Sequence, residues 1–241
     1  MTEADKAKNL SFCPVLNEMV STGRTADRDG AAVAPQGLST VNNLVVLHNL
    51  HRELKSAATL EIGLAYGASA LVFAQDHKDF GALPAGQHVA IDPFQDHLNH
   101  AGLAAIERAG LSGYVRHVIA FSDRALPALL DEGRRFGMIY IDGSHLFEDV
   151  FIDCHYAAQL LDEGGVMVLD DSTDTHVAKA LRFVRRNMSH LLTELDVAPY
   201  RADAGQPLRY KAARALGRAQ LTAFRKTGSE RRPYDAKLAS F

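Results

Sequence analysis

Apolar residues in the middle of the chain alternate between short runs and longer segments with helical spacing. The short runs predict β-strands over Thr59–Gly63, His88–Asp92, Val115–Ile119, Met138–Asp142 and Gly165–Asp170. The longer segments predict helices over Ala68–Asp76, His97–Ala109, Ala125–Glu132, Glu148–Leu161 and Val177–Met188. Strands that alternate with helices are typical of an α/β domain, in which helices cover both faces of a mostly parallel sheet.

The two ends of the chain differ from this middle region. Leu44–Leu54 has the pattern of an amphipathic helix, whereas Thr22–Ser39 is rich in glycine, alanine, arginine and aspartate and has no clear period. We expect Thr22–Ser39 to be a loop that folds over a site as a lid, or else a disordered connection without functional meaning. Leu191–Val197 and Leu208–Ala213 could pair as a terminal hairpin that adds an antiparallel strand at the sheet edge. The predicted division is an N-terminal helical or lid extension (1–55), an α/β domain (56–215) and a C-terminal tail (216–241).

The composition of the chain limits the kinds of molecule that it is expected to bind. The 241 residues, 47% of them hydrophobic, can bury the core of one domain. A net charge of −3 argues against nucleic acid or an anionic membrane as a partner, so a small molecule is expected. Two cysteines, Cys13 and Cys154, give neither a disulfide framework nor a cysteine-rich zinc site, which fits a reducing cytoplasm. The charged first ten residues and the lack of any long apolar run predict neither a signal peptide nor a membrane span.

Acidic residues and a histidine gather at two predicted strand ends. Asp142 and His145 follow the fourth strand, and Asp170 and Asp171 end the fifth. Open α/β sheets hold ligands at such strand ends. Carboxylate oxygens suit a hard cation, and the imidazole could act as a base. The structural alternatives are that His145 caps the following helix and that the paired acids form a loop favoured by the dipole of the next helix.

A glycine-bearing turn follows the first strand. Gly63 and Gly67 let the backbone bend sharply and approach a ligand, and the helix start offers unpaired N–H groups, so a nucleotide-like ligand is expected there. The spacing departs from the Gly-x-Gly-x-x-Gly of dinucleotide-binding folds, which weakens the case for a nicotinamide cofactor. Asp92, at the end of the second strand, could accept hydrogen bonds from a ribose diol. Alternatively, the glycines only shape a tight turn, and Asp92 caps a helix before Pro93.

Five motifs in order resemble those of class I S-adenosylmethionine-dependent methyltransferases. They are Glu61-x-Gly63-x-x-x-Gly67-x-Ser69, Ile91-Asp92-Pro93-Phe94, Phe121-Ser122 with Leu126-Pro127, Ile141-Asp142-Gly143-Ser144-His145, and Gly164-Gly165 to Asp170-Asp171. The resemblance covers roughly Leu60–Met188. More narrowly, the chain resembles a group of small-molecule O-methyltransferases that includes the metal-dependent macrolide-sugar enzymes and cephalosporin hydroxylase-like relatives. This resemblance implies a Rossmann-like fold with a mostly parallel seven-stranded sheet, and a homodimer or higher homo-oligomer.

The same resemblance implies S-adenosylmethionine as cofactor. The residues implied to bind it are Glu61, Gly63, Tyr66, Gly67, Ser69, Asp92, Ser122 with Asp123, and Asp142. The turn after the first strand would hold the methionine part, Asp92 the ribose, and Ser122 with Asp123 the adenine edge. Ser122 is equally suited to be a helix N-cap. Glu61 would bind the cofactor's ammonium through water, or else close a buried polar network.

The resemblance further implies Mg²⁺ (or Mn²⁺) bound by Asp142, Asp170 and Asp171, with His145 as general base. In the sugar-modifying relatives one of the paired acids is glutamate, whereas both are aspartate here. The shorter side chain could shift the metal or leave one acid outside the set of direct ligands. That acid would be Asp170 rather than Asp142 or Asp171. The expected function is O-methylation of a small molecule, such as a sugar, a natural product or a catechol-like diol. The alternatives are a metal-independent methyltransferase and a non-catalytic cofactor-binding protein.

Overall fold

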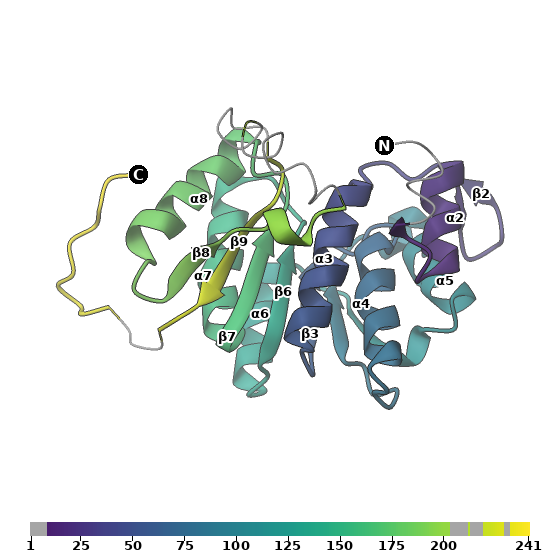
Figure 1. The fold of residues 1–241 in the computed structure, drawn as a ribbon, viewed down its shortest axis with the longest axis horizontal. Coiled ribbons are helices and arrows are strands. Elements are labelled where there is room, and N and C mark those ends of the chain that lie inside the picture. Colours follow the sequence, from purple (N-terminus) through teal and green to yellow (C-terminus); the bar gives the residue numbers. More distant parts are fainter. Residues whose placement is uncertain (1–8, 203–211, 213–218, 229–231) are drawn as a thin grey trace.

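A seven-stranded sheet forms the centre of the computed structural model, which describes residues 9–202, 212, 219–228 and 232–241 (Figure 1). The strand order is β5-β4-β3-β6-β7-β9-β8. The strands are β3 (Thr59–Ile62), β4 (His88–Ile91), β5 (Val115–Val118), β6 (Phe136–Ile141), β7 (Leu161–Leu169), β8 (Leu192–Leu195) and β9 (Thr222–Lys226). β3 to β7 run parallel, and β9 is antiparallel to both of its neighbours.

Helices cover both faces of this sheet (Figure 1). They are α2 (Pro14–Thr22), α3 (Val41–Leu54), α4 (Ala68–Asp79), α5 (Ala101–Arg108), α6 (Ser122–Asp131), α7 (Phe147–Leu160) and α8 (Thr175–Asn187), with 3₁₀ turns η1 (Gln95–Leu98), η2 (Ser112–Tyr114) and η3 (Ala198–Tyr200). α2 to α5 share one apolar core with Met138 and Tyr140 of β6, and α6 to α8 share another with Ile139 and Ile141. Alternate residues of a strand point to opposite faces, so β6 separates the two cores. None of the helices in the described part of the chain is long and apolar enough to cross a membrane.

The predicted α/β architecture is confirmed, with shifts at element boundaries. The single helix predicted over His97–Ala109 is divided, because Asn99 and His100 adopt left-handed backbone conformations (φ +44° and +56°) between η1 and α5. The helix predicted over Leu44–Leu54 begins earlier, at Val41. The Thr40 side chain caps it by accepting a hydrogen bond from the Asn43 amide.

The predictions for the C-terminal part need correction. β8 pairs with Thr222–Lys226, whereas most of Leu208–Ala213, its predicted partner, lies outside the described residues. Thr222–Lys226 was assigned to a tail, yet as β9 it lies inside the sheet between β7 and β8. Two consecutive residues of β9 suit this position, since Ala223 and Phe224 are buried on opposite faces of the sheet.

The segment predicted as a lid contains a short antiparallel hairpin of β1 (Thr25–Ala26) and β2 (Ala32–Val33). Arg108 of α5 donates to the Thr25 hydroxyl at 3.1 Å, and the Asn99 side chain donates to Asp27 at 3.0 Å. The hairpin is therefore fixed against α5 and the turn before it. Only the end of the segment, at Ser39, reaches the carboxyl ends of β6 and β7, through contacts described below.

A buried polar network joins α4 to β3 and β4. The Thr59 hydroxyl lies 2.9 Å from both His77 Nε2 and His88 Nδ1, and His88 Nε2 lies 3.3 Å from a Glu61 oxygen. One hydroxyl proton serves only one imidazole, so Thr59 donates to one ring and accepts from the other. Burial, assisted by the charges of His51 and His88, lowers the pKa of His77 to about 3. The network therefore holds His77 neutral.

This neutral histidine predicts a loss of stability in acid. The pKa of His77 is about 3 in the folded protein against an ordinary value of 6.5, so the unfolded chain binds a proton that the folded chain does not. The stability that neutral His77 contributes is fully present above the pKa of histidine in the unfolded chain. It is lost as the pH falls toward the pKa of His77 in the folded protein. We expect the free energy of unfolding to fall by about 2 kcal/mol between about pH 7.5 and about pH 5 from this group alone. Urea unfolding at both pH values measures the change, and His77→Gln should show a loss smaller by that amount. Equal losses in the two proteins would contradict the assignment.

Candidate functional site

A cavity of about 600 Å³ opens at the carboxyl ends of the central strands. It lies where the chain, having placed β4 and β5 on one side of β3, returns to place β6 on the other. Such a switch point is the usual ligand site of an open α/β sheet, and the volume suits a nucleotide-sized ligand. Residues that line it include Gly63, Asp92, Phe94, Phe121, Ser122 and Asp142.

The two glycines of the turn after β3 allow close backbone contacts. Gly63 has a φ of +95°, and a Cβ there would overlap the carbonyl oxygen of Asp142. Gly67 has a φ of +82°, and a Cβ there would lie 2.9 Å from the carbonyl oxygen of Gly102 in α5. Gly63 therefore brings the ends of β3 and β6 together at the cavity. Gly67 serves the packing of the turn against α5 and is not among the residues that line the cavity.

Asp92 joins the two loops that border the cavity. One of its carboxylate oxygens accepts the amides of Leu64 and Ala65 at 3.1 and 2.7 Å, and the other accepts the amide of Phe94 at 2.6 Å. A carboxylate has about four acceptor positions, so the oxygen bound by Phe94 retains one for a ligand hydroxyl. The interpretation of Asp92 as a helix cap is wrong, because Phe94 is the N-cap of η1 and the contact from its amide lies within the turn before η1. The exposure of Asp92 to the cavity leaves the predicted ribose contact open.

Aromatic residues form one wall of the cavity. The rings of Phe94 and Phe121 are 5.6 Å apart and nearly perpendicular, and about half of each side chain is exposed. Ser122 and Asp123 line the cavity next to them. The interpretation of Ser122 as an N-cap is wrong, because Phe121 holds that position and Ser122 is the first residue of α6. The role of Phe94 and Phe121 as a wall was missed, although aromatic residues directly after two strands were a usable signal.

Besides Gly67, three of the residues expected at the cofactor lie outside the cavity lining. Glu61 is fully buried in the network with His88, as its structural alternative predicted. Ser69 is buried in the first turn of α4, and Tyr66 packs against the apolar core on the α4 face. The turn after β3 thus presents Gly63 and Ala65 to the cavity. The side chains of Glu61, Tyr66 and Ser69 pack against the protein interior instead.

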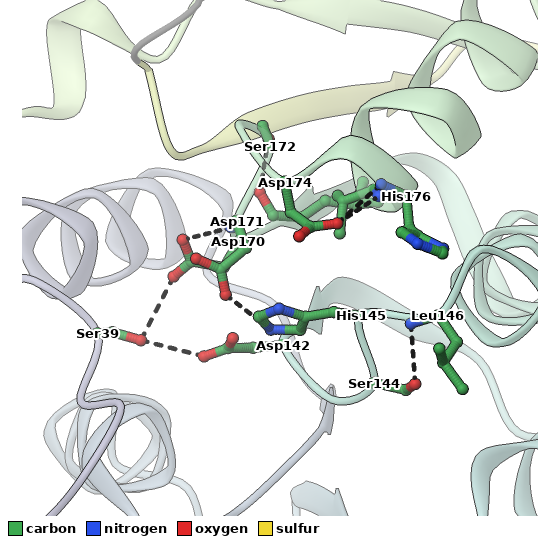
Figure 2. Close-up of polar contacts among 12 residues, drawn as sticks. Ser39, Asp142, Ser144, His145, Leu146, Asp170, Asp171, Ser172, Asp174 and His176 are labelled. Atoms are coloured by element: carbon green, nitrogen blue, oxygen red, sulfur yellow. Dashed lines mark hydrogen bonds and ion pairs between the residues drawn. The ribbon is translucent and has the colours of Figure 1, made fainter.

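Beside the cavity, the ends of β6 and β7 bring Asp142, His145 and Asp171 together (Figure 2). One ligand atom from each of the three lies within 4.8 Å of the others, so they could hold a metal ion. His145 Nε2 is 2.9 Å from an Asp171 oxygen, and the histidine side chain is 52% exposed. Asp142 also lines the cavity, so the cavity and this group share a residue.

Asp170, predicted to join this group, points in another direction (Figure 2). Its oxygens accept the Asn43 side-chain amide at 2.9 and 3.0 Å and the Tyr140 hydroxyl at 2.5 Å. Asp171 has a left-handed backbone (φ +48°), which turns the chain so that its carboxylate faces His145. Strain at a residue other than glycine persists where the surroundings enforce it and is frequent at functional sites.

Burial and neighbouring charges raise the pKa values of Asp142 and Asp170. Burial is the largest cause of the high pKa of Asp142, followed by the charge of Asp170, although the Tyr140 and Ser39 hydroxyls donate to it and act in the opposite direction. Burial also raises the pKa of Asp170 and holds that of Tyr140 well above its usual value, so Tyr140 is a neutral donor. Adjacent carboxylates with little water are a favourable place for a divalent cation, whose charge offsets their repulsion.

The structural alternative for His145 is wrong, whereas the one for the paired acids, a loop favoured by the dipole of the next helix, stays a prediction. Leu146, and not His145, is the N-cap of α7, and the amide of Phe147 donates to His176. Asp174 caps α8, because its side chain accepts the amides of His176 and Val177. The helix ends are therefore satisfied by other residues, and Asp142, His145 and Asp171 are not needed for capping.

Comparisons with known proteins agree with this geometry. Residues 60–172 match the family model described as a methyltransferase domain. The structure is similar to the O-methyltransferase from Bacillus cereus in complex with SAH, with 18% identity, a TM-score of 0.57, and coverage of 67% of this chain and 76% of that chain. It is also similar to the O-methyltransferase TomG from Streptomyces achromogenes, involved in tomaymycin synthesis and in complex with SAM, with 21% identity, a TM-score of 0.58, and coverage of 79% and 82%. At these identities the structural matches establish a shared fold. A search of curated protein sequences finds no significant match.

The contact between Gly63 and Asp142 gives a prediction on stability. Gly63→Ala adds a left-handed alanine and a Cβ that overlaps the Asp142 carbonyl oxygen, whereas Gly133→Ala adds only a left-handed alanine (φ +71°) with open space around it. We expect Gly133→Ala to cost about 1 to 2 kcal/mol. Gly63→Ala should cost about 1 to 3 kcal/mol more, because the strand ends must separate. Urea unfolding compares the two variants. Equal losses would show that the ends of β3 and β6 do not need this close approach.

Proposed function

Because the chain contains a methyltransferase domain with the class I, S-adenosylmethionine-dependent fold, we propose that it transfers a methyl group from S-adenosylmethionine to a hydroxyl group of a small molecule. One observation carries this proposal: the cavity at the switch point opens beside Asp142, His145 and Asp171, and Asp142 belongs to both. A methyl donor in the cavity would therefore lie next to side chains able to orient and deprotonate an acceptor.

The lining of the cavity suits the parts of S-adenosylmethionine. Phe94 and Phe121 offer aromatic faces for the adenine, with Ser122 and Asp123 beside them as polar partners for its edge. Asp92 retains an acceptor position for a ribose hydroxyl. Gly63, without a side chain, leaves room for the methionine part close to the β3 backbone.

His145 is suited to act as the general base. Its Nε2 lies 2.9 Å from Asp171, so we assign the proton to Nε2, which leaves Nδ1 as an acceptor. Asp171 thereby fixes the tautomer and orientation of the imidazole. In the proposed reaction the hydroxyl oxygen forms a bond to the methyl carbon, and the carbon–sulfur bond breaks with its electron pair left on sulfur. The hydroxyl proton goes to Nδ1 of His145.

Asp142 and Asp171 are suited to hold Mg²⁺ or Mn²⁺. Carboxylate oxygens are the preferred ligands of these ions, and the raised pKa of Asp142 shows the electrostatic cost that a cation would offset. When bound, such a cation would hold substrate oxygens and favour their ionised form. Two neighbouring oxygens chelate better than one, so the proposed acceptors are catechols and vicinal diols of sugars or other natural products.

Calorimetric titration of S-adenosylmethionine into EDTA-treated protein is the first test. We expect binding with a Kd of roughly micromolar, because the cavity residues do not depend on a cation. Methyl transfer to a catechol such as caffeate should fall at least about 100-fold after chelation and return with Mg²⁺. The lack of any cofactor binding would exclude the methyltransferase proposal. Unchanged turnover in EDTA would favour the metal-independent alternative.

Replacing His145 tests its assignment as the general base. His145→Gln should lower kcat by about 100-fold or more, because no group remains at Nδ1 to accept the proton. Its affinity for S-adenosylmethionine should stay within about twofold, since His145 is not among the residues that line the cavity. His155→Gln, an exchange of an exposed histidine in α7, serves as the control. Full activity of His145→Gln across the pH range would assign the proton transfer to another group.

A further inference from the structure

Asp170 is held in place by two residues of the N-terminal extension. Asn43 of α3 is almost fully buried and donates to both carboxylate oxygens of Asp170, at 2.9 and 3.0 Å. Ser39, which precedes the N-cap of α3, has its hydroxyl 3.1 Å from Asp142 and 3.4 Å from Asp170 (Figure 2). Ser39 lies 103 positions before Asp142, and Asn43 lies 127 positions before Asp170. The extension therefore reaches the proposed cation site through side-chain contacts.

These contacts form one connected set with Tyr140. The Tyr140 hydroxyl lies 2.9 Å from the Ser39 hydroxyl and donates to Asp142 at 3.0 Å as well as to Asp170. A single hydroxyl proton cannot serve three acceptors at once, so the Ser39 proton supplements it. Ser39 and Tyr140 both contact the same Asp142 oxygen, Oδ2. This fixes the direction of the Asp142 carboxylate and leaves its other oxygen for a ligand.

We propose that Ser39 and Asn43 are positioning residues of the cation site, which couple the N-terminal extension to cation binding. The inference rests on the proposed function. Asn43 holds the Asp170 carboxylate against the Tyr140 hydroxyl, which in turn contacts Asp142. Ser39 contacts Asp142 directly. A cation bound by Asp142 and Asp171 then strengthens the contact between Ser39 and the strand ends, and so orders the start of α3.

Groups behind metal ligands commonly change metal affinity by about 10- to 100-fold when removed. Without Asn43, the buried Asp170 carboxylate loses its amide donor and its fixed direction, so Tyr140 and Ser39, which contact both acids, no longer hold Asp142 in place. Without Ser39, Asp142 loses one of the two hydroxyls that orient it. Neither residue is among those that line the cavity, so the affinity for S-adenosylmethionine should not change with them.

The test measures Mn²⁺ binding by electron paramagnetic resonance, with Asn43→Ala, Ser39→Ala and the control Asn49→Ala. Asn49 lies on the same helix, but its side chain donates to the Tyr200 carbonyl oxygen, away from the acids. We expect Asn43→Ala and Ser39→Ala to weaken Mn²⁺ binding by about tenfold or more and Asn49→Ala by less than about twofold. Affinity for S-adenosylmethionine in EDTA should be the same for all four proteins, which also confirms folding. Hydrogen exchange of residues 39–44 should slow when Mn²⁺ binds to the wild type.

Each result decides the inference. Wild-type Mn²⁺ affinity in both Asn43→Ala and Ser39→Ala would overturn it, as would hydrogen exchange that Mn²⁺ leaves unchanged. No Mn²⁺ binding by the wild type would overturn it together with the cation part of the proposed function. Methyl transfer in EDTA would then still be measurable, so the failure of the positioning role is distinguishable from the failure of the methyltransferase proposal. If Asn43→Ala does not fold, the more exposed Ser39→Ala carries the test.

Discussion

The close approach of β3 to β6 places the whole site. The Asp142 carbonyl group lies so close to Gly63 that any side chain there would overlap it. The ladder also continues past the strand ends, because the Asp142 amide donates to Ile62 and the Asp170 amide donates to Ile141. The carboxyl ends of β3, β6 and β7 are therefore level with one another. This brings the cavity beside β3 next to the acidic residues after β6 and β7, although the chain between Gly63 and Asp170 forms most of the domain.

A second constraint gives the adjacent acids Asp170 and Asp171 different surroundings. Residues in sequence on a strand point to opposite faces, and the left-handed backbone of Asp171 turns its side chain further toward His145. Asp170 is nearly buried and accepts neutral donors from Asn43 and Tyr140, whereas Asp171 remains partly exposed with the imidazole. Two adjacent aspartates thus have different tasks because their surroundings differ. One orients its neighbours from within the protein, and the other is free to meet a cation or a substrate.

The sequence was sufficient for the elements whose pattern is local. Apolar runs and helical spacing predicted β3 to β7 and the helices between them, and the parallel order brought Asp142, His145 and Asp171 to one edge as expected. The direction of Asp170 was not predictable, because it depends on a left-handed turn at an aspartate and on Asn43 from a distant helix. The partner of β8 was likewise a choice between segments that only tertiary packing decides. Asp92 was placed correctly at the cavity, but no sequence pattern indicates the amides that occupy its carboxylate.

The origin of the side chains divides the site into two parts. Every residue that lines the cavity lies within the segment that matches the methyltransferase family model, 60–172. Asn43 and Ser39, which orient the acids next to the cavity, lie before that segment. The matched segment therefore contains the proposed site of the methyl donor, but it does not contain all the residues that surround the acidic group. Function differs among proteins of one fold through such additions. In this protein such an addition is the contact between α3 and the ends of β6 and β7, where the N-terminal extension meets the acidic residues.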